Sequence, residues 1–138
     1  MLLTFDQGAE IPTRMHTFFE RTFDVLFYKH DATKETSFRR KFKTALVIDD
    51  FRPIFATFSA FTYLDHGSSF THSQAMNCAS AALEYNASSE RADAFVSDLC
   101  TSVSILIREG ENYNYIHRSM QEFFVAQFLA FRELENWD

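Results

Sequence analysis

The residues whose types could do chemistry are scattered along this chain of 138 residues. Histidine is the side chain best suited to proton transfer near neutral pH, but none of the five histidines falls in a His-x-x-x-His pair or beside a cysteine at the spacing of zinc ligands. They are His16, His30, His66, His72 and His117. No Gly-x-Ser-x-Gly turn presents a nucleophilic serine. The spacing of these residues along the chain therefore predicts a protein without catalytic activity. The alternative is a catalytic triad of residues distant in the sequence, which only the folded chain would bring together.

Cysteines and glycines give no sign of a metal, a disulfide or a bound nucleotide. Cys78 and Cys100 lie in apolar helical patterns without a CxxC motif, which favours reduced core thiols over a metal site or a disulfide. None of the three glycines, Gly8, Gly67 and Gly110, precedes a lysine. A phosphate-binding loop needs glycines and a lysine. We therefore expect no metal, no cofactor and no ATP hydrolysis.

A polar corner between a strand and a helix is the most informative feature, in the segment NYNYIHRSMQEFFVAQFL that starts at position 112. Tyr113 and Tyr115 alternate with polar residues, as in a half-buried strand. Ser119 and Glu122 have the spacing of a capping box, so a helix should begin near Ser119. His117 can bond to backbone groups left unpaired at this corner. We interpret His117, Ser119 and Glu122 as structural.

The helix after this corner is apolar around most of its circumference. Met120, Phe124, Phe128 and Phe131 form one stripe, while Phe123, Val125, Ala126, Leu129 and Ala130 occupy most of the other positions. Such a helix is either central to a core or part of an interface. Residues that could face solvent or a partner there are the interface candidates Arg118, Gln121, Val125 and Leu129.

Elements that position these residues follow from periodicity and capping signals. The sequence predicts a mostly α fold: a compact bundle of about five or six helices with one small, winged-helix-like β-hairpin before the last helix. The predicted helices cover about residues 12–30, 36–46 (capped by Thr36 or Ser37), 51–64 (capped by Asp49), 72–85 (capped by Thr71), 90–101 (capped by Ser88 or Ser89) and 119–134. The predicted hairpin pairs residues 103–107 with residues 113–116.

Composition indicates one helical domain over residues 1–138. Seventeen phenylalanines beside three glycines and two prolines favour aromatic packing between long elements. No run reaches the roughly 18 apolar residues of a membrane span, and a secretory signal is absent, so we expect a cytoplasmic protein without membrane contact. The net charge of -6 argues against binding to nucleic acid. Protein partners or self-association remain as the expected interactions.

The segment YIHRSMQEFFVA, residues 115–126, resembles the aromatic-x-His-x-x-x-Gln-Glu-aromatic-x-x-Ala signature of NACHT-type (STAND) signal-transducing NTPases. In that family the signature follows the nucleotide-binding core, near the end of a winged-helix region. Residues 11–31 and 95–110 are similar to neighbouring parts of the same region. The resemblance implies a noncatalytic interaction or regulatory module. The alternative is a free-standing small helical effector or toxin–antitoxin component with an unrecognised active site.

Overall fold

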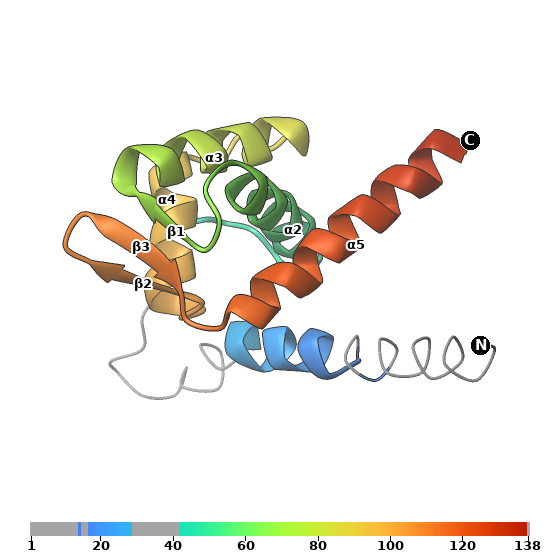
Figure 1. Ribbon diagram of the computed structural model, residues 1–138, viewed down its shortest axis with the longest axis horizontal. Helices are drawn as coiled ribbons and strands as arrows, with labels where there is room; N and C mark the ends of the chain where they lie inside the picture. The colour runs from blue at the N-terminus through green and yellow to red at the C-terminus, as the bar shows by residue number, and fades with distance from the viewer. Residues whose placement is uncertain (1–13, 15–16, 29–41, 138) are drawn as a thin grey trace.

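The computed structural model describes residues 14, 17–28 and 42–137, with side chains described as far as residue 132. As predicted, it is mostly helical with one small antiparallel sheet (Figure 1). Residues 17–28 form what we call the N-terminal helix. The elements that follow are α2 (Ile48–Asp65), β1 (Ser69–Thr71), α3 (His72–Tyr85), α4 (Ala92–Ser97), the π-helical turn η1 (Asp98–Ser102), β2 (Leu106–Glu109), β3 (Asn112–Tyr115) and α5 (Arg118–Trp137).

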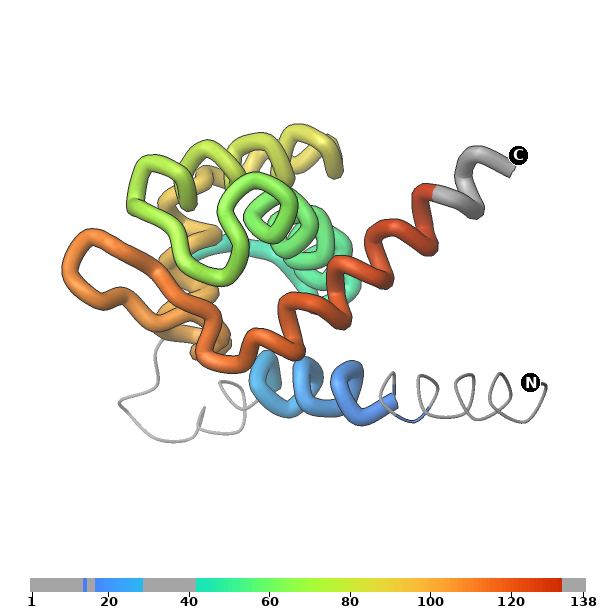
Figure 2. The backbone as a smooth tube through the Cα atoms, in the orientation of Figure 1, coloured from blue at the N-terminus to red at the C-terminus, as the bar shows by residue number. Residues whose placement is uncertain are grey.

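Helix α2 lies at the centre of the aromatic core. The N-terminal helix and α5 pack on one side of α2, and α3 packs on the other (Figure 2). Phe23 of the N-terminal helix stacks on Phe55 of α2, with ring centroids 5.5 Å apart. Phe124 of α5 closes the group at 5.3 Å from Phe23 and 4.9 Å from Phe55. These interlocked rings hold three helices together, as the phenylalanine content predicts.

The sheet contains the predicted hairpin, but its first strand is Leu106–Glu109 and not residues 103–107. It also contains one strand that was not predicted. Strands β2 and β3 pair antiparallel around Gly110, whose φ of +65° suits the left-handed turn. Strand β1 pairs antiparallel with the other edge of β3, giving the order β1-β3-β2. The sequence placed Ser69–Thr71 in a connection, because three residues are too few to show an alternating pattern.

Helix boundaries follow the capping signals only in part. Thr71 caps α3, as predicted, and Gln74 forms a capping box with it that was not predicted from the sequence. Helix α2 instead begins at Ile48 after Val47, so Asp49 lies in the first turn, where its charge suits the helix dipole, and is not the cap. The predicted fifth helix begins at Ala92 rather than Glu90 and ends in the π-helical turn η1.

Part of the helix predicted at residues 36–46 is an extended segment bound by a buried carboxylate. Residues 36–41 lie outside the described residues, and residues 42–47 are not helical. Asp98 in η1 is fully buried and binds this segment: its Oδ1 accepts from the Lys43 N–H at 2.7 Å, and its Oδ2 accepts from the Thr44 N–H at 3.0 Å and the Thr44 hydroxyl at 2.8 Å. Because these donors bond to Asp98, the chain enters α2 extended instead of helical.

Within the described part of the chain, no helix has the length and hydropathy needed to cross a membrane.

Candidate interaction surface

The predicted corner between strand and helix lies at the start of α5, but its contacts differ from the predicted capping box. Helix α5 begins at Arg118, and the Met120 N–H donates to the His117 carbonyl at 3.1 Å. Glu122 pairs with Arg118 at 3.4 Å across one exposed turn, a kind of contact that contributes little to stability. The described structure contains no capping bond between Ser119 and Glu122. His117 and Ser119 are exposed at this corner.

Gln121 is fully buried, which corrects the expectation that it faces solvent or a partner. Its amide donates to the Gly67 carbonyl at 2.9 Å and to the Thr62 hydroxyl at 3.2 Å. Thr62 also bonds to the Tyr115 hydroxyl at 3.1 Å, and burial raises the pKa of Tyr115 well above its usual value. Gln121 therefore ties the start of α5 to the end of α2. Among the described residues, its Oε1 has no hydrogen-bond partner.

The apolar stripe of α5 begins in the core and ends outside it. Met120, Phe124 and Phe128 are buried, and so is the interface candidate Val125. Phe131 continues the same stripe but is 61% exposed. The change occurs because the last turns of α5 extend beyond the body formed by the other elements (Figure 1).

Leu129 is the interface candidate whose position agrees best with a role in binding. It is 48% exposed on the same projecting turns as Phe131. We call Leu129 and Phe131 the α5 apolar tip. Arg118 is also exposed, but it lies at the other end of α5 and pairs with Glu122.

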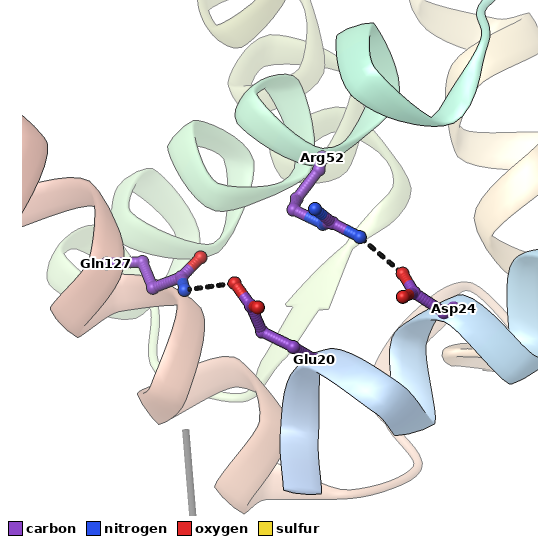
Figure 3. Close-up of polar contacts among 4 residues, drawn as sticks. All are labelled: Glu20, Asp24, Arg52 and Gln127. Carbon is purple, nitrogen blue, oxygen red and sulfur yellow. Dashed lines mark hydrogen bonds and ion pairs between the residues drawn. The ribbon is translucent and has the colours of Figure 1, made fainter. Parts of the chain in front are cut away.

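Two polar contacts join the N-terminal helix to its neighbours, one to α5 and one to α2 (Figure 3). The Gln127 amide of α5 donates to Glu20 at 2.9 Å. One turn further along, Asp24 forms an ion pair with Arg52 of α2, whose guanidinium also lies 5.7 Å from the centre of the Phe23 ring. These contacts join the N-terminal helix to α5 and to α2 beside the aromatic core.

A pair of titratable side chains, His72 and Tyr113, joins α3 to the sheet. The Nδ1 of His72 lies 3.0 Å from the Tyr113 hydroxyl, and the Arg108 guanidinium lies 5.3 Å from the centre of the Tyr113 ring. Burial is the main cause that raises the pKa of Tyr113 above its ordinary value. A phenol that holds its proton this firmly is a weak nucleophile at neutral pH. The contact therefore packs α3 against the sheet.

Neither cysteine forms a disulfide, and neither thiol is activated. Burial raises the pKa of the Cys78 and Cys100 thiols to about 11, so both are protonated at neutral pH. Cys78 nevertheless lies beside Asp65 and His66, and one potential ligand atom from each of the three is within 4.8 Å of the others. Sequence spacing missed this group, because its members come from the end of α2 and the middle of α3.

Comparison with protein-family models, with curated proteins and with solved structures found no match. The chain's own geometry must therefore support any proposal about its function.

Proposed function

We propose that this chain is a noncatalytic protein–protein interaction module that binds through the α5 apolar tip. The observation that supports this most directly is the continuation of the stripe from buried Phe128 to exposed Phe131. Residues at the same spacing on the same helix face serve first as core and then as surface. A partner packed on the tip would continue the helix bundle with the same contacts that the core uses.

Burial of the tip supplies a driving force of useful size. Fully burying a Leu or Phe side chain contributes about 1.5–3 kcal/mol. Leu129 and Phe131 each retain about half or more of their surface for a partner, at 48% and 61% exposure. Because successive residues of an α-helix are about 100° apart around its axis, Leu129 and Phe131 lie on nearly opposite sides of α5. A partner that contacts both must therefore enclose the exposed end of the helix.

The partner that this geometry specifies most simply is a second copy of the chain. Two copies related by a twofold axis would each supply the same α5 apolar tip, so that the exposed end of one α5 packs against the exposed end of the other. Such a contact requires no second surface on either molecule. The order of helices, hairpin and final helix is also compatible with the regulatory arm of a NACHT-type NTPase, and such a module would act in the cytoplasm.

Changing Leu129 to Glu should convert an associated protein into a monomer without unfolding it. A carboxylate is costly in an apolar contact but well solvated on an exposed turn. Sedimentation velocity measures the association, and circular dichroism measures the fold. As a matched control, Ser119→Glu adds the same charge to an exposed turn about 15 Å away on the same helix. This control should associate like the wild-type protein.

A wild-type protein that stays monomeric at high concentration would contradict self-association through the tip. Equal association of the Leu129→Glu and Ser119→Glu variants would place the interface elsewhere on the molecule.

The rival proposal of an effector with an unrecognised active site predicts a ligand that the motifs do not reveal. We expect no saturable binding of Mg-ATP in isothermal titration calorimetry and no phosphate release, because the sequence lacks the glycines and lysine that hold phosphates. Saturable binding in the micromolar range, or turnover above a buffer blank, would favour the rival.

A further inference from the structure

Three side chains that zinc uses as ligands converge where α2 ends against α3. Asp65 is the last residue of α2, His66 follows it directly, and Cys78 faces them from α3. One potential ligand atom from each residue lies within 4.8 Å of the other two. Tetrahedral zinc separates its ligand atoms by about 3.5 Å, so closure of about 1 Å completes the geometry. Asp65 is exposed and His66 half-buried, so both side chains have room to make that movement.

The turn that carries Asp65 and His66 is held from several directions. The His66 and Gly67 N–H groups donate to the Thr62 carbonyl at 2.7 and 2.8 Å. Gly67 has a φ of +86°, which glycine adopts without strain, and its carbonyl accepts from the buried Gln121 at 2.9 Å. Ligands on an anchored backbone lose less freedom when a metal binds.

We propose that Asp65, His66 and Cys78 form a zinc-binding site. The donor set decides the class of metal, because a thiolate with an imidazole suits zinc, whereas calcium and magnesium prefer oxygen ligands alone. Three protein ligands leave one position for water or for a group from another molecule. The site is separate from the α5 apolar tip, so zinc binding and association can be tested independently.

The experiment uses zinc with a competing indicator, and cobalt(II) as a spectroscopic probe, on the reduced full chain. We expect one ion per chain, with a thiolate-to-cobalt charge-transfer band in the near ultraviolet. Cys78→Ser should remove this band and lower zinc affinity more than about tenfold. The matched control is Cys100→Ser, which removes the other free cysteine and should keep both the band and the affinity.

Circular dichroism of the metal-free variants separates loss of a ligand from loss of the fold. If Cys78→Ser unfolds, Asp65→Asn and His66→Gln replace it, and each should weaken zinc binding more than about tenfold with the fold retained. Absence of zinc binding to the wild-type chain would overturn the proposal. So would equal affinity in Cys78→Ser and Cys100→Ser, or unchanged affinity in the Asp65 and His66 variants.

Discussion

Replacing Phe124 with Ala should lower the free energy of unfolding by about 3–5 kcal/mol, the usual cost of removing a fully buried phenylalanine ring. Phe124 is fully buried and meets Phe23 of the N-terminal helix and Phe55 of α2. Its loss opens a cavity where three helices join. The core cannot collapse onto this cavity without moving at least one of the three helices, because the interior is closely packed.

Urea unfolding followed by circular dichroism measures this change, with the variant and the wild type at the same low concentration. Phe131→Ala is the matched control, because it removes the same ring from an exposed position of the same stripe and should change stability by no more than about 0.5 kcal/mol in the monomer. Similar losses at the two positions would mean that α5 does not pass from core to surface between them.

Replacing Asp98 with Asn should lower the free energy of unfolding by about 2–4 kcal/mol, because bonds to a charged group contribute about 1.5–3 kcal/mol each and part of the loss is recovered by the amide oxygen. The two carboxylate oxygens accept from the Lys43 and Thr44 N–H groups and from the Thr44 hydroxyl. In the Asp98→Asn variant, the amide NH₂ group would replace one carboxylate oxygen and would face the N–H donor that this oxygen now accepts from. The site is fully buried, so water cannot compensate.

Denaturant unfolding again provides the measurement, and Asp93→Asn is the control, since Asp93 is an exposed aspartate on the neighbouring helix α4. Thr44→Val should cost less than Asp98→Asn, because it removes only the hydroxyl bond. A stability of Asp98→Asn equal to that of Asp93→Asn would show that the segment before α2 does not depend on this carboxylate.

Regular, periodic elements were predictable from the sequence, and contacts between distant residues were not. The hairpin and the Thr71 cap follow from local signals, and the structure confirms both. The non-helical chain at residues 42–47 depends on Asp98, more than 50 residues away, so helix periodicity misled the prediction there. Strand β1 likewise exists because β3 offers it an edge.

For the candidate surface, the sequence predicted the apolar stripe of α5 but not the point along the helix at which this stripe leaves the core. Gln121 was expected to face outward because it is polar, yet Thr62 and Gly67 satisfy its amide inside the protein. The exposure of Phe131 depends on how far the other helices reach, which no local pattern encodes. The approach of Cys78 to His66 is another consequence of packing between α2 and α3.

Hydrogen exchange of the wild-type protein, measured below and above the concentration at which it associates, tests the interaction proposal most directly. Association through the apolar tip should slow exchange of the backbone amides in residues 128–137 of α5. It should leave those of the β2–β3 hairpin unchanged. Protection confined to the hairpin or to another element, with no concentration dependence in α5, would contradict the proposal.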